Sequence, residues 1–232
     1  MVIVMIRGFY AAMSGANAAQ IKLDTLANNI ANTETTGYKA QTASFADTLY
    51  ANTNQNIHIG SGARQIGNSI RFSQGMREQT GGAYDFYIEG SGFFAVQNKN
   101  GDTYYTRNGC FSLSYEDGKS YLVTADGQYV LDNNNQMIEI IDDADSVLPG
   151  VFEFANPYAL QLVGDSNFAA TELSGNAEFT EKSTVVGGCL EASIVDMVSE
   201  MVKMIEAQRA FQFNSRMIQT SDELKKTVNN LR

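Results

Sequence analysis

The placement of glycine and proline is the strongest constraint on the fold of this 232-residue chain. Seventeen of the 20 glycines and both prolines lie between Gly60 and Gly188, and the last 40 residues contain neither. Glycine and proline interrupt helices and favour turns. The pattern therefore predicts a turn-rich middle flanked by two regions that can form long helices.

The first helix is predicted from about Met5 to Thr33, with Met1–Val4 as an extension without structure of its own. Its apolar residues recur in steps of four and three, which is the spacing of a seam that faces another helix. The seam residues expected here are Phe9, Met13, Leu23, Ala27 and Ile30. Three threonines and Gly37 end the helix, so residues 1–36 are predicted to form the N-terminal helical segment.

The second helix is predicted within residues 189–232. It begins near Ser193, where Ser193 and Asp196 form a capping-box pattern. Its apolar residues cover about half of the circumference, and the seam residues expected on it are Val198, Met201 and Ile205. So wide an apolar face indicates more than one packing partner.

The middle, residues 72–188, is predicted to be β-rich and antiparallel. Short apolar runs follow one another with Asn-Gly and Asp-Gly links, which supply the residues that tight hairpins need. In "DFYIEGSGFFAVQ" we expect a hairpin, with strands on either side of the Gly-Ser-Gly turn. Residues 142–188 are expected to add two to four strands, and residues 37–71 to form an extended connector without clear periodicity.

These segments together predict an α+β fold. Because single helices are marginally stable in water, the simplest arrangement pairs the N- and C-terminal helices with each other as a coiled coil. The antiparallel β-rich domain is then an insertion between them. A subunit of this kind is suited to stacking with copies of itself.

The N-terminal helix carries amides where a solvated helix usually carries charges. Between Gly8 and Thr33 the only charged residues are Lys22 and Asp24. Amides donate and accept hydrogen bonds without the desolvation penalty of a buried charge, so we expect contacts between subunits, with a solvated, low-charge face as the alternative. The candidate contact residues are Asn28, Asn29, Asn32, Gln208, Arg209, Gln212 and Asn214.

Composition and residue types argue against several other functions. The net charge of −10, without a basic run, disfavours nucleic-acid binding, and no apolar run is long enough to cross a bilayer. We expect no cofactor and no metal site, since one histidine and two cysteines cannot form an ordinary zinc site. Cys110 and Cys189 are expected to be buried thiols, with a disulfide as the alternative.

An enzyme is disfavoured for similar reasons. The carboxylates Asp85 and Glu89 could form a glycosidase-like pair, but their place beside the glycine turn favours a role in the strand or the turn. His58 is expected in an edge strand or connector, and Cys110 has no neighbouring base to activate it.

Three stretches resemble the flagellar axial proteins of the bacterial rod and hook. They are "LDTLANNIANTETTGYK", the region of "DFYIEGSGFFAV" with "YYTRNGCFSL" and "LVTADGQYVL", and the C-terminal "EMVKMIEAQRAFQFNSRMIQTSDELKKTVNNLR". The resemblance implies a structural subunit of the basal-body rod, which polymerises helically into a rigid tube that transmits torque and encloses an export channel. It also implies assembly with other rod and hook subunits, and type III export to the cell envelope outside the cytoplasmic membrane without a cleaved signal peptide.

Within that family the C-terminal stretch is closer to the distal rod type, while a proximal rod or hook-like subunit remains the alternative. Hook subunits usually carry an extra β domain, for which the segment from Tyr38 to Glu191 is too short. A different class is a monomeric or trimeric binding module, such as an adhesin or tail-fibre-like protein with a coiled-coil stalk, for which a stable closed trimer would be evidence. Sedimentation of the purified chain distinguishes that trimer from an open polymer.

Overall fold

The computed structural model describes residues 2–48, 51–53, 57–59, 62–116, 118–140, 148–164, 166–180 and 182–230. The fold is α+β, with a helix near each end of the chain and a central antiparallel β-rich part. The chain divides into two compact units. We call residues 1–31, 41–71 and 196–232 the helical unit, and residues 32–40 and 72–195 the β unit.

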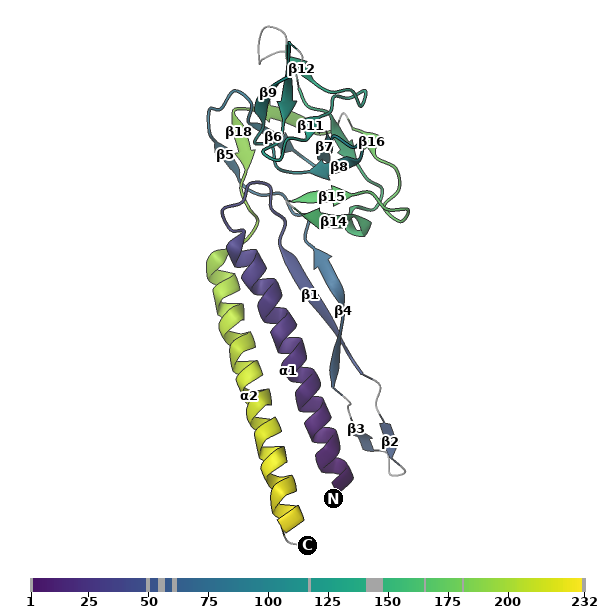
Figure 1. The fold of residues 1–232 in the computed structure, drawn as a ribbon, viewed down its shortest axis with the longest axis vertical. Coiled ribbons are helices and arrows are strands. Elements are labelled where there is room, and N and C mark those ends of the chain that lie inside the picture. Colours follow the sequence, from purple (N-terminus) through teal and green to yellow (C-terminus); the bar gives the residue numbers. More distant parts are fainter. Residues whose placement is uncertain are drawn as a thin grey trace. The chain divides into compact units, whose positions relative to one another are not determined.

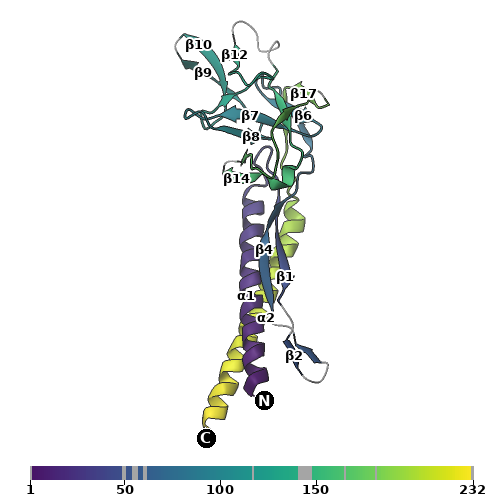
Figure 2. The same cartoon turned by 90° about the vertical axis from the view of Figure 1, so that its right-hand side faces the viewer.

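Two long antiparallel helices form most of the helical unit. Helix α1 (Val2–Ala31) and helix α2 (Met197–Asn230) lie side by side, with the start of one near the end of the other (Figures 1 and 2). Helix α1 begins earlier than predicted, so Val2–Val4 belong to it and are not an unstructured extension.

The start of α2 differs in detail from the predicted capping box. The Asp196 carboxylate accepts a hydrogen bond from the backbone N–H of Val198 at 3.1 Å, and the Asp196 carbonyl accepts the N–H of Glu200 at 3.0 Å. Asp196 is therefore the N-cap residue. Ser193 instead accepts the N–H of Val195 at 3.3 Å, and it lies four residues before the first residue of the helix.

The buried stripe of α1 agrees with the predicted seam at every second position. At the positions between, the residue one place earlier in the sequence is the buried one. Ala12, Ala19 and Leu26 are buried, whereas Met13 is 50% exposed and Ala27 is also exposed. The other predicted residues, Phe9, Leu23 and Ile30, are half-buried. Hydrophobicity alone would favour burial of Met13. Small alanine side chains, however, let two helices approach closely, and the stripe with Ala12 and Ala19 is the one that is buried.

On α2 the three predicted seam residues do not face the interior of the unit. Val198, Met201 and Ile205 are 72%, 47% and 51% exposed. The side of α2 that packs on α1 has another phase, because Glu200 and Ala207 are the buried residues of this helix. The buried or half-buried series on this side is Glu200, Met204, Ala207, Phe211, Asn214, Ile218, Ser221 and Lys225.

The predicted connector, residues 37–71, contains paired strands. Strand β1 (Gln41–Asp47) pairs antiparallel with β4 (Ala63–Ile70), and β2 (Ala51–Thr53) pairs with β3 (Ile57–Ile59), which holds His58. The β1–β4 ribbon packs against α1. Periodicity does not reveal this ribbon because most of β4 is exposed, so the alternation that marks a half-buried strand is missing.

The β unit contains a ten-stranded antiparallel sheet and two smaller strand pairs. The sheet runs in the order β12-β10-β11-β7-β8-β15-β14, with β9 on β10, β13 on β7, and β16 on β13, while β17 pairs with β6 and β18 with β5. The earlier strands are β5 (Arg77–Gln79), β6 (Phe86–Glu89), β7 (Phe93–Gln97), β8 (Thr103–Thr106), β9 (Ser112–Glu116), β10 (Lys119–Val123), β11 (Tyr129–Val130) and β12 (Glu139–Ile140). The later elements are β13 (Val151–Glu153), the short 3-10 helix η2 (Pro157–Ala159), β14 (Gln161–Gly164), β15 (Asn167–Ala169), β16 (Glu178–Phe179), β17 (Thr184–Gly187) and β18 (Cys189–Glu191).

The predicted hairpin around Gly-Ser-Gly is wrong, although both of its strands exist. Strand β6 pairs with β17, and β7 pairs with β8, β11 and β13. Gly90 and Gly92 have φ of 120° and 118°, and a Cβ at Gly92 would lie 2.5 Å from Val151 Cγ1. The glycines thus carry the chain from one sheet to another instead of reversing it in a tight turn.

Two other turn predictions are confirmed, whereas the Asn108–Gly109 link does not join a hairpin, because β8 does not pair with β9. Strands β7 and β8 form a hairpin across "KNGD", and β9 and β10 form one across "EDGK". Between residues 148 and 188 the described chain has five strands, against the two to four predicted for residues 142–188. The core of the unit contains Phe94, Val96 and Val130, each fully buried, and burying such a side chain contributes about 1.5–3 kcal/mol.

Gly109 is the position in this core where a side chain is least acceptable. A Cβ there would lie 1.8 Å from the Phe86 carbonyl oxygen, and the Gly109 carbonyl accepts the Phe86 N–H at 3.0 Å. We expect Gly109→Ala to lower the free energy of unfolding by about 3 kcal/mol. The control is Gly187→Ala, whose Cβ would have its nearest neighbour at 4.0 Å, with an expected change below about 1 kcal/mol. Equal effects in chemical denaturation would contradict this account.

Candidate assembly surfaces

Asn29, predicted to contact another subunit, is buried inside the helical unit at 1% exposure. Its Nδ2 donates to the Gln41 carbonyl at 2.8 Å and to Glu200 Oε2 at 3.1 Å, and its Oδ1 accepts the Gln41 N–H at 2.9 Å. The amide therefore joins α1 to β1 and to α2. Lys203 completes the group with a 2.6 Å ion pair to Glu200.

The other predicted contact residues have different surroundings. Asn214 is half-buried and lies against Gly15, because a Cβ at Gly15 would be 2.9 Å from Asn214 Nδ2. In the β unit, Asn32 Oδ1 accepts a hydrogen bond from the Thr35 hydroxyl at 3.1 Å. The remaining predicted residues are exposed in the single chain: Asn28, Gln208, Arg209 and Gln212.

The first three turns of α2 expose a band of apolar side chains. Each is at least 40% exposed, and they recur at a spacing that places them on one side of the helix. The α2 band consists of Met197, Val198, Met201, Val202 and Ile205. Apolar groups concentrated in this way mark an interaction surface.

The β unit contains a buried ion cluster that the sequence analysis missed. Lys39 Nζ lies 2.5 Å from Glu191 Oε1, and Arg107 Nη1 lies 3.2 Å from Glu191 Oε2. Lys39 also donates to the Ser73 carbonyl at 2.7 Å, and Glu191 Oε1 accepts the Gly75 N–H at 2.7 Å. One carboxylate therefore connects four segments of the chain. All three charged side chains are at least 94% buried.

The burial of this cluster affects the protonation of its lysine. Desolvation lowers the pKa of Lys39 below its ordinary value, while the attraction of Glu191 opposes the shift without cancelling it. The repulsion of Arg107 acts in the same direction as burial. Glu191 thus opposes the lowering of the Lys39 pKa that burial causes. A glutamate between apolar residues in "GCLEASIV" was the sequence signal for it.

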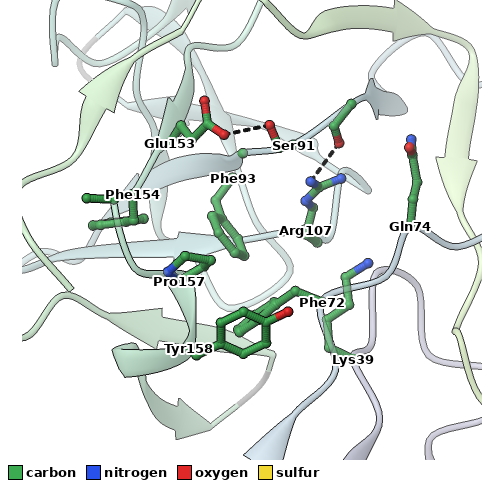
Figure 3. A pocket seen from close by; sticks show the side chains of 13 residues that line it. Lys39, Phe72, Gln74, Ser91, Phe93, Arg107, Glu153, Phe154, Pro157 and Tyr158 are labelled. Atoms are coloured by element: carbon green, nitrogen blue, oxygen red, sulfur yellow. Dashed lines mark hydrogen bonds between the residues drawn. The ribbon is translucent and has the colours of Figure 1, made fainter. Parts of the chain in front are cut away.

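A cavity of about 560 Å³ lies beside the cluster in the β unit (Figure 3). The rings of Phe72, Phe93 and Tyr158 gather along it, and Arg107 lies over the Phe93 ring at 5.6 Å. The Ser91 hydroxyl donates to Glu153 at 2.7 Å, and Arg107 donates to the Gly90 carbonyl at 2.8 Å (Figure 3). Its charged lining groups are thus already engaged in bonds that hold the fold together.

The residues considered for catalysis also have structural partners. The Asp85 carboxylate accepts a hydrogen bond from the Thr80 hydroxyl at 2.5 Å, and the Asp85 backbone forms a bridge with Cys110. Glu89 is an exposed residue at the end of β6. Cys110 is an exposed free thiol, contrary to the prediction, whereas Cys189 is a buried free thiol as predicted.

Two searches of the described residues were negative. No group of three or more histidine, cysteine, aspartate or glutamate side chains is arranged to hold a metal ion among them. None of the described helices combines the length and apolarity that crossing a membrane needs.

Three family descriptions match successive parts of the chain. Residues 9–39 match "Flagella basal body rod protein", and residues 87–148 match "Flagellar hook protein FlgE/F/G D1 domain". Residues 186–231 match "Flagellar basal body rod FlgEFG protein C-terminal". The matches cover most of α1, much of the β unit and all of α2.

Similar proteins extend over nearly the whole chain. The flagellar basal-body rod protein FlgG of Bacillus subtilis is 32% identical over 98% of this chain and 100% of its own length. FlgG of Borreliella burgdorferi is 32% identical over 98% of this chain and 99% of its own. FlgG of Agrobacterium fabrum is 34% identical over 96% of this chain and 98% of its own.

Proposed function

The chain belongs to the flagellar basal-body rod protein family, and from this membership we propose how its two units build the rod. It is a structural subunit of the rod, of the distal type, and not an enzyme. It assembles with other rod and hook subunits in a polymer of the flagellar basal body. A proximal rod or hook-like subunit and a stalked adhesin are not favoured.

We propose that α1 and α2 pair as an antiparallel coiled coil. Support comes from the buried and half-buried positions of both helices, which alternate in steps of three and four as facing helices require. On α1 they are Phe9, Ala12, Ala16, Ala19, Leu23, Leu26 and Ile30. They meet the series on α2 that begins at Glu200 and ends at Lys225, with Lys225 Nζ 4.6 Å from the centre of the Phe9 ring.

The observation that carries the assembly mechanism is the α2 band. Water-exposed apolar residues such as Val198 and Val202 stabilise nothing in the single chain, whereas burial of each in an interface would contribute on the order of 1–2 kcal/mol. We propose that a second copy of this chain covers the band. The band would contact a different surface of the second copy, in a head-to-tail manner. Head-to-tail contacts whose rotation does not close into a ring continue as an open helical polymer.

The wider role follows from the rod as a whole. Many simultaneous helix contacts give the stiffness that transmission of torque demands, and a tube of such helices encloses a channel. We propose that the helical units form the inner layer of this tube and the β units its outside. We also propose that the chain reaches the rod by type III export, without a cleaved signal peptide, and acts in the cell envelope outside the cytoplasmic membrane.

Substitution in the α2 band tests the assembly mechanism. We expect Val202→Asp to reduce polymerisation at least tenfold, because a charge would have to be desolvated in the interface. Val202 is 53% exposed in the single chain, so the free energy of unfolding should change by less than about 1 kcal/mol. Sedimentation and electron microscopy measure polymer, and circular dichroism measures stability.

A matched control comes from the same helix. Glu206→Gln removes a charge beside the α2 band, one turn from Val202, without placing a charge within the band, and it should leave polymerisation nearly unchanged. Normal polymers from Val202→Asp would show that another surface joins the subunits.

A further inference from the structure

The pairing of α1 and α2 raises the question of what fixes their register. The buried residues Ala12, Ala19 and Leu26 are seven apart on α1, as are Glu200 and Ala207 on α2. Two helices with a seven-residue repeat can slide by one repeat and still bury the same kinds of positions. Small apolar side chains do not distinguish these registers, so a polar or steric feature must do so.

Two contacts define the observed register. Asn29 donates to Glu200 at 3.1 Å, and Gly15 leaves room for Asn214, since a Cβ at Gly15 would lie 2.9 Å from Asn214 Nδ2. Asn29 and Gly15 are two repeats apart on α1, and Glu200 and Asn214 are two repeats apart on α2. Both contacts therefore belong to one and the same antiparallel register.

The glycine contact alone does not exclude a neighbouring register. If α2 slid by seven residues towards the start of α1, Asn214 would face Gly8, where a Cβ has nothing within 4 Å. Glu200 would then face Lys22, an oppositely charged side chain. This slipped register thus offers space for Asn214 and a cation for Glu200.

The asparagine contact does exclude it. In the slipped register Asn29 would lie beyond Met197, the first residue of α2, and would lose Glu200. A slip in the other direction would place Asn29 against Ala207, which has no side-chain acceptor. Asn29 cannot turn away to find another partner, because its amide is held by both the N–H and the carbonyl of Gln41.

We propose that the buried Asn29–Glu200 hydrogen bond is the register lock of the α1–α2 pair, with Asn29 as its positioning residue. The proposal rests on the proposed coiled-coil pairing and adds the residue that selects one register of it. A subunit with slipped helices would present the α2 band at another height, so the lock also determines which subunits can join the polymer.

Disulfide trapping in the full-length chain tests the lock. In a Cys110→Ser background, Gly15→Cys with Asn214→Cys reports the observed register, and Gly8→Cys with Asn214→Cys reports the slipped one. Each pair is equilibrated in a glutathione buffer, and the two cross-linked fractions are compared in solution and in sedimented polymer. The parent chain should form the Gly15–Asn214 cross-link at least tenfold more than the Gly8–Asn214 cross-link.

Substitutions then show whether the Asn29–Glu200 hydrogen bond, and not merely any change of an amide on α1, sets the ratio of the two cross-links. Asn29→Leu should raise the slipped cross-link relative to the observed one at least tenfold. Asn28→Leu, the same change at the preceding exposed residue, should leave the ratio unchanged. Glu200→Gln should also preserve it, because its amide oxygen still accepts a hydrogen bond from Asn29.

The possible failures have different meanings. An unchanged ratio in Asn29→Leu overturns the register lock. If that variant forms neither cross-link, Glu200→Met decides, since it keeps the Gln41 bonds and removes only the acceptor; an unchanged ratio there also overturns the lock. Absence of the Gly15–Asn214 cross-link in the parent chain, in solution and in polymer, would overturn the helix pairing and with it the proposed function.

Discussion

A chain that lacks residues 1–31 should form no polymer and yet retain a folded β unit. The deletion removes α1, so the series on α2 from Glu200 to Lys225 loses its partner and the helical unit cannot form. The β unit keeps all of its residues, because it begins at residue 32. Sedimentation should show no assembly, while circular dichroism should still show a cooperative β-sheet transition.

A slightly longer deletion provides the matched control. Removal of residues 1–40 also takes away Lys39, which pairs with Glu191, and Gly37, whose N–H donates to the Glu191 carbonyl at 2.7 Å. This second deletion should lower the stability of the β unit by several kcal/mol, on the order expected when a buried ion loses its partner. Tubular polymers from the first deletion, or equal damage to the β unit in both, would contradict this division of the chain.

Glu191→Gln should destabilise the β unit by about 3–5 kcal/mol. The substitution leaves Lys39 and Arg107, both buried, without the anion that compensates them. Removing one member of a buried ion cluster leaves an uncompensated charge. The loss of stability is larger than for an exposed ion pair, which contributes about 0–1 kcal/mol.

Cys189 offers a local measurement of this effect. It is buried two residues before Glu191, so a thiol reagent reaches it only when this part of the unit opens. With Cys110 replaced by serine, Glu191→Gln should raise the modification rate of Cys189 about a hundredfold or more, because each 1.4 kcal/mol is a factor of ten. Glu89→Gln, at an exposed carboxylate of β6, should leave the rate nearly unchanged.

A triple variant tests whether charge compensation is the cause. Lys39→Met with Arg107→Leu and Glu191→Leu removes the whole cluster, and replacing all members of a buried ion group is often neutral. We expect it to recover much of the stability lost by Glu191→Gln. If the triple variant is as unstable as the single one, the shape of Glu191 and its bond to the Gly75 N–H dominate instead.

The sequence predicted the larger organisation because it depends on patterns that extend over many residues. Two long helices, the strands on either side of Gly-Ser-Gly, and hairpins such as the one at Gly118 follow from periodicity and turn residues. The family resemblance rested on three long stretches and is confirmed by the matches. The sequence did not show which of two neighbouring residues faces the other helix, since Met13 is the more hydrophobic residue but Ala12 is the buried one.

The polar residues show most clearly what pattern alone cannot give. Asn29 was predicted to contact another subunit, but its hydrogen-bond partners lie in β1 and α2 of the same chain. They are 12 and 171 residues away, so no local spacing relates them to Asn29. Glu191 was missed for the same reason, because Lys39 and Arg107 become its neighbours only when distant strands have paired.

The position of Glu191 near the end of the β unit has a consequence for the timing of folding. Strand β5 pairs with β18 and strand β6 with β17, so both need partners from near the end of the unit. The cations of Lys39 and Arg107 likewise pair with a carboxylate that is synthesised after them, that of Glu191. A chain that emerges with its N-terminus first, as in the proposed export, would therefore lack both strand pairs and the compensating carboxylate until residue 191 had passed. The strands of the ten-stranded sheet all precede that point, so the part of the β unit completed last is the one held by β17, β18 and the ion cluster.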